Sequence, residues 1–231
     1  MKRVAGLILL FAAACAAQPW QSLFDGKTLN GWRVEAKAAD KAKGFWKAVD
    51  GVIECDSIGR KDHDYVWLIH EREFSDFELQ LKVMGFKEST GNSGVQVRSR
   101  WDAEREWLHG PQVDIHPPAP WRVGLVYDET YEARRWIYPS LKNWEIAPEQ
   151  GPKVWKWNAD GWNDISITCK GGHIKTVVNG VTITDADLTA VLNDEAHQKR
   201  RAGMKGHIAL QLHSRDELKI RYKDLRIREL R

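Results

Sequence analysis

Short runs in which polar and apolar residues alternate make up most of the chain, and turn dipeptides such as Asp-Gly, Asn-Gly and Gly-Gly separate them. Alternation with a period of two places successive side chains on opposite faces of a β-strand. The pair Asn179-Gly180, between two β-branched runs, is typical of a two-residue hairpin turn. Eight runs show the pattern: residues 46–54, 74–85, 94–98, 111–116, 162–170, 175–185, 206–213 and 217–229. The pattern predicts an all-β protein with two stacked sheets.

Two stretches interrupt the alternation. Residues 130–160 hold four of the 12 tryptophans and three prolines without a sustained pattern, which predicts a long Trp-rich loop. Residues 186–205 are typical of one short helix followed by a basic loop. Because no repeat or low-complexity linker divides the chain, we expect a single domain over residues 18–231.

The first 17 residues have the features of a secretory signal peptide: two basic residues, an apolar run and then small residues. The run is too short to span a membrane, so we expect a periplasmic or secreted protein without a transmembrane segment. Lipidation of Cys15 is the alternative to simple cleavage. Without Lys2 and Arg3, 33 basic and 32 acidic residues leave a net charge of +1. A near-neutral domain lacks the basic stripe that nucleic acid requires.

Two further cysteines, Cys55 and Cys169, leave two alternatives open. An exported protein can join them in a disulfide, or both can be small buried apolar residues. No Cys-x-x-Cys or clustered Cys/His spacing indicates a zinc site.

Three of the expected strands carry directed hydrogen-bonding groups on the face opposite their apolar residues, where an ordinary solvent face carries Lys, Glu, Thr and Ser. The side chains expected on this outer face are Gln96, Arg98, Gln112, Asp114, His116, Gln211 and His213. Amide, guanidinium, carboxylate and imidazole groups together can bind vicinal hydroxyls or polarise a carbonyl. The three strands therefore predict a polyol or keto-sugar site, with a solvated sheet face as the alternative.

A further strand, at 124–129, ends in the acidic pair Asp128-Glu129. A carboxylate at a strand end beside a groove can act as a general base, so Glu129 is the first candidate and Asp114 the second. An ordinary turn opening is the alternative for the acidic pair, and spacing alone slightly favours it.

Several motifs, in the same order along the chain, resemble the 3-keto-disaccharide hydrolase family. They are SLFDGKTLNGW (22–32), GNSGVQVR (91–98), GPQVDI (110–115), GLVYDE (124–129), WNDISITCKGGHIKTVVNGVTITD (162–185) and GHIALQLHSRDELKIRYKDLRIREL (206–230). The resemblance implies a concanavalin A-like jelly-roll sandwich in an exported bacterial enzyme. It also implies a glycoside substrate that is already oxidised to a ketone at sugar C3.

The ketone implies how such a glycoside is cleaved: a base removes the acidified C2 proton, the C1 substituent leaves, and water adds back. On this hypothesis Glu129 or His213 is the base, and Asp114 orients a partner or ligates a divalent cation that polarises the ketone. The residues expected to contact substrate are Arg98, Gln96, Gln112, Tyr127, Gln211, Trp107 and Trp136. No other cofactor is implied.

Two other functions are alternatives to this one. A non-catalytic, lectin-like carbohydrate-binding module could use the same polar face and exposed tryptophans, but it would not need Glu129 and His213 together. A conventional jelly-roll glycosidase is disfavoured, because no Glu-x-Asp-x-x-Glu string occurs in the sequence.

Overall fold

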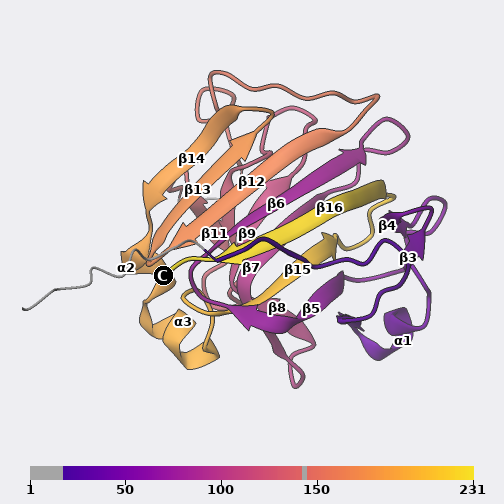
Figure 1. The fold of residues 1–231 in the computed structure, drawn as a ribbon, viewed down its shortest axis with the longest axis horizontal. Helices are drawn as coiled ribbons and strands as arrows, with labels where there is room; N and C mark the ends of the chain where they lie inside the picture. Colours follow the sequence, from indigo (N-terminus) through magenta and orange to yellow (C-terminus); the bar gives the residue numbers. More distant parts are fainter. Residues whose placement is uncertain (1–17, 142–144) are drawn as a thin grey trace, which may run out of the picture.

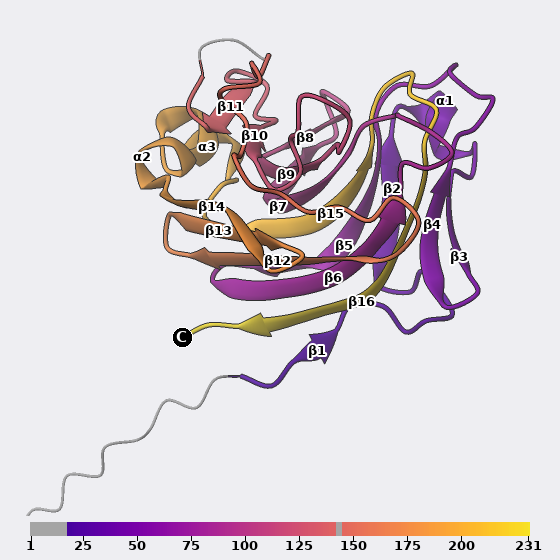
Figure 2. The same ribbon diagram turned by 90° about the horizontal axis from the view of Figure 1, so that it is seen from above.

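Two antiparallel sheets stacked face to face contain all the strands of the computed structural model, which describes residues 18–141 and 145–231 (Figures 1 and 2). Sheet A has the order β14 (Val181–Asp187), β13 (His173–Val178), β12 (Asn163–Lys170), β6 (Phe77–Gly85), β16 (Lys219–Glu229), β4 (Val52–Asp56) and β3 (Trp46–Val49), with β1 (Gln21–Ser22) beside β16. Sheet B has the order β11 (Arg135–Tyr138), β10 (Val126–Asp128), β9 (Pro111–Ile115), β7 (Ser93–Asp102), β15 (Gly206–Leu212), β5 (Val66–Phe74) and β2 (Trp32–Ala36), with β8 (Trp107–His109) beside β7. The prediction of an all-β, two-sheet jelly-roll sandwich is confirmed.

The alternation in the sequence corresponds to the faces of the strands. On β9 and β15, Val113, Ile115, Leu210 and Leu212 point into the core between the sheets. Burial of a large apolar side chain stabilises the fold by about 1.5–3 kcal/mol. A one-residue slip would move this apolar set to the outer face, so the pattern fixes the register. The polar residues between them are therefore held on the face of sheet B that points away from sheet A.

In the described part of the chain, three short helices lie outside the sheets. Two of them, α2 (Thr189–Leu192) and α3 (Glu195–Arg200), lie in the segment where one helix was expected (Figure 2). The Asp194 side chain accepts a hydrogen bond from the His197 amide and so begins a new helix after α2 ends. The third helix, α1 (Ala38–Lys41), is too short to show helical periodicity in the sequence.

The Trp-rich segment is partly ordered into sheet B, because β11 lies within it. Farther along, Trp155 stacks on Trp121 with ring centroids 4.3 Å apart, so these two rings cover each other. Trp144 lies outside the described residues, as do the expected signal peptide at 1–17 and the Cys15 lipidation site.

The two described cysteines, Cys55 and Cys169, are free thiols buried in sheet A. Of the two alternatives left open by the sequence, burial as small apolar residues is the one observed, and burial raises the pKa of both thiols. Within residues 18–141 and 145–231, no helix is long and apolar enough to cross a membrane.

Candidate functional site

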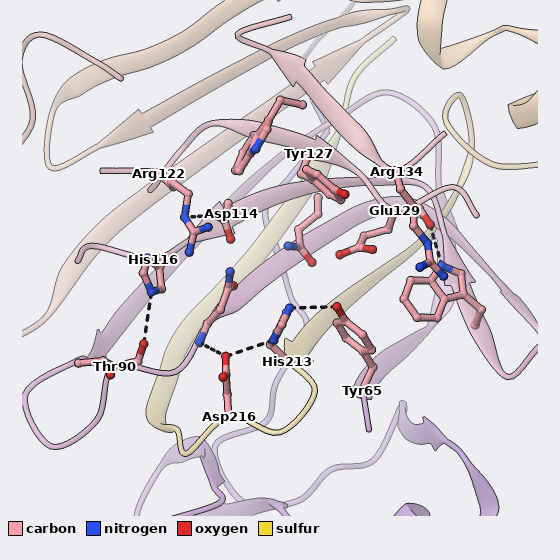
Figure 3. A pocket seen from close by; sticks show the side chains of 14 residues that line it. Tyr65, Thr90, Asp114, His116, Arg122, Tyr127, Glu129, Arg134, His213 and Asp216 are labelled. Atoms are coloured by element: carbon pink, nitrogen blue, oxygen red, sulfur yellow. Dashed lines mark hydrogen bonds and ion pairs between the residues drawn. The ribbon is translucent and has the colours of Figure 1, made fainter. Parts of the chain in front are cut away.

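A pocket of about 420 Å³ opens on the outer face of sheet B (Figure 3). It lies over the central strands β9, β7 and β15, between the β10 and β11 side and the segment that leads into β5. Seven of the ten residues expected from the sequence line it: Trp107, Gln112, Asp114, Tyr127, Glu129, Trp136 and His213.

Three glutamines lie on adjacent strands at the base of the pocket: Gln112 lines it as its floor, and Gln96 and Gln211 lie buried beneath it. Gln96 pairs with Gln112 across β7 and β9, and Gln211 lies on β15, on the other side of β7. All three are buried, and none of their Oε1 atoms has a hydrogen-bond partner among the described residues. An unpaired buried acceptor is costly unless a donor reaches it. A hydroxyl group of a ligand would supply such a donor to Gln112, the one of the three that lines the pocket.

Gly94 makes room for the floor. A Cβ atom on this residue would lie 2.3 Å from Cδ of Gln112, well inside van der Waals contact. The second glycine of the motif GNSGVQVR, Gly94, is therefore needed because the Gln112 side chain lies across its backbone.

Glu129 follows β10 directly and is 5% exposed. Its backbone is held on both sides: its amide donates to the Gly110 carbonyl at 3.0 Å, and its carbonyl accepts from Nε1 of Trp107 at 2.7 Å. Its Oε1 accepts a hydrogen bond from Nε2 of Gln211 at 3.1 Å. Burial raises its pKa to about 7, although the Gln211 bond and the nearby charges of His213 and Arg134 oppose the shift. This carboxyl group can therefore exchange a proton at neutral pH.

Asp114, on β9, is a second buried carboxyl group in the pocket. Burial raises its pKa to about 6, and the charges of Arg122 and His213 limit the rise. The Nε atom of Arg122 lies 3.3 Å from its Oδ2 atom. Asp114 is thus placed to hold a hydroxyl group together with Arg122, which comes from the loop before β10.

His213 follows β15 and lies between an acid and a phenol. Its Nδ1 atom is 3.2 Å from Oδ2 of Asp216, and its Nε2 atom is 2.9 Å from the hydroxyl of Tyr65 (Figure 3). Burial alone would lower the pKa of His213, but the carboxylates of Asp216, Glu129 and Asp114 outweigh it and raise the pKa. The imidazole is therefore disposed to carry a proton.

The aromatic residues of the pocket are packed against one another. The guanidinium of Arg134 lies over the Trp107 ring, 4.2 Å from its centroid, so one face of this indole is covered. Tyr127 meets Trp136 edge to face at 5.2 Å, and burial raises the pKa of Tyr127 to about 12. These side chains form walls, and the stacking of Trp107 on a sugar ring stays a prediction.

Gln96 and Gln211 support the pocket from below, whereas Arg98 does not line it. The prediction that Arg98 lies on the outer face with Gln96 is wrong. His207 pairs with Ser99 and Ala209 with Gln96, so one residue of β15 faces two of β7. This β-bulge, with φ of 51° at Arg98, ends the alternation.

The Arg98 side chain is fully buried and bonds to the ends of both sheets. Nε donates to the Ser75 carbonyl at 2.5 Å, Nη1 to the Gly171 carbonyl at 2.6 Å, and Nη2 to Oδ1 of Asp76 at 3.0 Å. Arg98 therefore joins the two sheets and does not contact the pocket.

Six residues that line the pocket were not expected from the sequence: Tyr65, Thr90, Asn92, Arg122, Arg134 and Asp216. The His-x-x-Asp spacing from His213 to Asp216 could have indicated one of them. Tyr65 could not be predicted as a site residue, because it shares one strand face with Trp67 and Ile69 and this apolar face resembles a core face. The two arginines lie on irregular connections, where the sequence has no periodic signal.

The described residues form no group of three or more His, Cys, Asp or Glu side chains that could hold one metal ion. The divalent cation predicted as one alternative for Asp114 therefore has no ligand set among these residues.

Known structures share the fold at low sequence identity. A crystal structure assigned as a glycosyl hydrolase from Parabacteroides distasonis has a TM-score of 0.61 at 18% identity and covers 97% of this chain and 99% of its own. The carbohydrate-binding module CBM66 from Bacillus subtilis has a TM-score of 0.51 at 13% identity, covering 86% of this chain and 96% of its own. Both similarities show the jelly-roll fold alone.

Sequence comparison extends to the family. A curated 3-keto-disaccharide hydrolase from Bacteroides thetaiotaomicron is 37% identical over 82 residues, which are 34% of this chain. The match spans about a quarter of that relative's length, 27%. Residues 19–228 match the family described as the 3-keto-alpha-glucoside-1,2-lyase-like domain. A match over nearly the whole described chain shows that the protein belongs to this family.

Proposed function

We propose that the pocket cleaves glycosides whose sugar carries a ketone at C3. One observation carries this proposal: Glu129 is an almost fully buried carboxyl group, held by Gln211, with a pKa near 7. Proton transfer is most efficient when the pKa of the base lies near the working pH. A module that only holds a sugar has no need of such a carboxyl group. Membership of the 3-keto-glucoside lyase-like family supports the same substrate class.

The floor of the pocket supports recognition of a sugar. The unpaired Oε1 atom of Gln112, which lines the pocket, accepts a hydrogen bond from a hydroxyl group. The carboxyl group of Asp114 and the guanidinium of Arg122 bind a further hydroxyl group from the adjoining wall. A substrate with several neighbouring hydroxyl groups satisfies these groups together.

Glu129 starts the reaction by taking the C2 proton. The ketone makes this proton acidic because the electron pair left behind spreads onto the C3 oxygen. Because burial raises its pKa to about 7, Glu129 can exchange between its acid and base forms at neutral pH. Arg122 and the amide of Gln112 stabilise the charge on the C3 oxygen by donating hydrogen bonds to it.

Bond cleavage follows from the enolate. A double bond forms between C1 and C2 as the C1–O bond breaks, and its electron pair leaves with the departing oxygen. That oxygen takes a proton from the side of the pocket that holds His213. Water then adds to C1, and Glu129 returns its proton to C2, which yields the free keto sugar. The net reaction is hydrolysis.

Incubation with 3-keto-trehalose and other 3-keto-glycosides tests the proposal by release of keto sugar. A second probe, 3-keto-1,5-anhydroglucitol, has no leaving group on C1 and isolates the first step. We expect the wild-type chain to exchange the C2 proton of this probe for deuterium in D₂O. Glu129→Gln keeps the shape of the side chain and an acceptor for Gln211, so it should lose exchange and cleavage while binding is retained.

Binding without exchange or cleavage by the wild-type chain would show a lectin-like module instead. An unchanged exchange rate in Glu129→Gln would remove this residue from the role of base. We place the reaction outside the cytoplasm on the strength of residues 1–17, and fractionation of a producing cell tests that setting.

A further inference from the structure

Tyr65 stands at the edge of the pocket with its ring fixed on three sides. It stacks on Trp67 at 5.4 Å with an interplanar angle of 10°. It also meets Trp107 edge to face at 4.9 Å and His213 edge to face at 4.7 Å. The ring can therefore move little, and its hydroxyl group is held in the pocket beside His213 (Figure 3).

Both nitrogen atoms of His213 already have neighbours that can share a proton. The Nδ1 atom faces Asp216, and the Nε2 atom contacts the Tyr65 hydroxyl. Asp216 is fixed in turn, because its Oδ2 atom accepts a hydrogen bond from the Asn92 amide at 2.7 Å. A proton that leaves His213 toward the pocket therefore passes to Tyr65 first. The hydroxyl of Tyr65 is the end of the chain Asp216–His213–Tyr65.

We propose that the Tyr65 hydroxyl is the general acid that protonates the leaving oxygen, and that His213 and Asp216 act through it. This inference rests on the proposed function. As the C1–O bond breaks, the leaving oxygen takes the Tyr65 proton and the Tyr65 oxygen takes the proton from Nε2 of protonated His213. When water adds to C1, its proton returns to His213 by the same route. No other reactant is needed.

The surroundings keep Tyr65 in the form that donates. Burial, together with the negative charge of Glu129, raises the pKa of its hydroxyl group, so Tyr65 does not ionise at neutral pH. The base and the acid also come from different parts of the site. Glu129 follows β10 on the floor, whereas Tyr65 precedes β5 at the opposite side of sheet B.

Leaving groups of different basicity test this role. A p-nitrophenyl 3-keto-glucoside expels a stable phenolate and needs little help from an acid, whereas the methyl 3-keto-glucoside needs a proton on its leaving oxygen. General acid catalysis contributes about 10²–10⁴-fold, so Tyr65→Phe should slow the methyl substrate by about 10²-fold or more. It should slow the p-nitrophenyl substrate by only about 10-fold or less, and it should leave deuterium exchange into 3-keto-1,5-anhydroglucitol intact.

Tyr131→Phe is the matched control, because it removes a tyrosine hydroxyl that is exposed and outside the pocket lining. Both substrates should be cleaved at the wild-type rate by this variant. Equal losses for the two substrates in Tyr65→Phe, or loss of exchange together with cleavage, would overturn the role of Tyr65. A wild-type chain that neither exchanges nor cleaves would instead refute the proposed function, and this inference with it.

Asp216→Asn gives a readout that a purely structural role would not move. The charged and titratable groups around His213 are Asp216, Glu129, Asp114, His116 and Tyr65. Removing the Asp216 charge lowers the pKa of His213, so the alkaline limb of the pH–rate profile for the methyl substrate should move to lower pH. An alkaline limb at its wild-type position would contradict the proton path through His213.

Discussion

Replacement of Arg98 by Met separates two roles for this residue, as a ligand for substrate or as a tie between the sheets. The structure shows a fully buried guanidinium that donates hydrogen bonds to the carbonyls of Ser75 and Gly171 and to the carboxylate of Asp76. Removing one partner of a buried ion pair costs about 3–5 kcal/mol. Asp76 is 35% exposed and can regain water, so we expect the lower end, about 3 kcal/mol.

For a chain of this size, 1 kcal/mol corresponds to about 2–4 °C, so the melting temperature should fall by about 6–12 °C. Thermal and urea unfolding measure this loss, and sugar binding at a temperature where the variant is folded should match the wild type. Arg100→Met is the control, because Arg100 pairs with Glu73 nearer the surface and should cost less than about 1 kcal/mol. An Arg98→Met variant with unchanged unfolding and lost sugar binding would refute the assignment made from the bulge.

Two further predictions concern the pocket itself. Gly94→Ala should displace Gln112 from the floor of the pocket and raise KM by about tenfold, because the hydrogen bonds of Gln112 to the substrate are lost. Gly151→Ala is the control: the atom nearest to its new Cβ would lie 3.5 Å away, so KM should not change. Because Glu129 must be ionised to act as a base and its pKa is raised to about 7, the acid limb of kcat/KM should have its midpoint near pH 7, before the alkaline limb that His213 sets. An acid limb centred near the ordinary carboxyl pKa would contradict this.

The strands were predictable because burial on one face leaves a period of two in the sequence. Val113 and Leu210 point into the core as expected, and Gln112 and Gln211 point away from it. The same alternation failed at Arg98, because the bulge arises from how β7 pairs with β15 and not from any residue pattern within β7. The inward and outward faces of a strand can be predicted from that strand's own sequence, whereas a β-bulge depends on how two strands pair.

The site was predictable only where it is built from regular strands. Asp114 and Gln112 share a face of β9, and Glu129 and His213 each follow a strand. The sequence could not predict the proton affinities of these residues, because the raised pKa of Glu129 comes from burial under groups far away in the chain.

The sequence by itself determined a two-sheet β-sandwich and the polar face on which a sugar-like ligand would be held, because alternation and turn residues are local properties. Only the tertiary structure decided which groups meet on that face. It moved Arg98 into the space between the sheets, and it brought Tyr65 to His213, 148 residues apart in sequence. The contacts that set proton affinities here are long-range, so they exist only once the strands are paired.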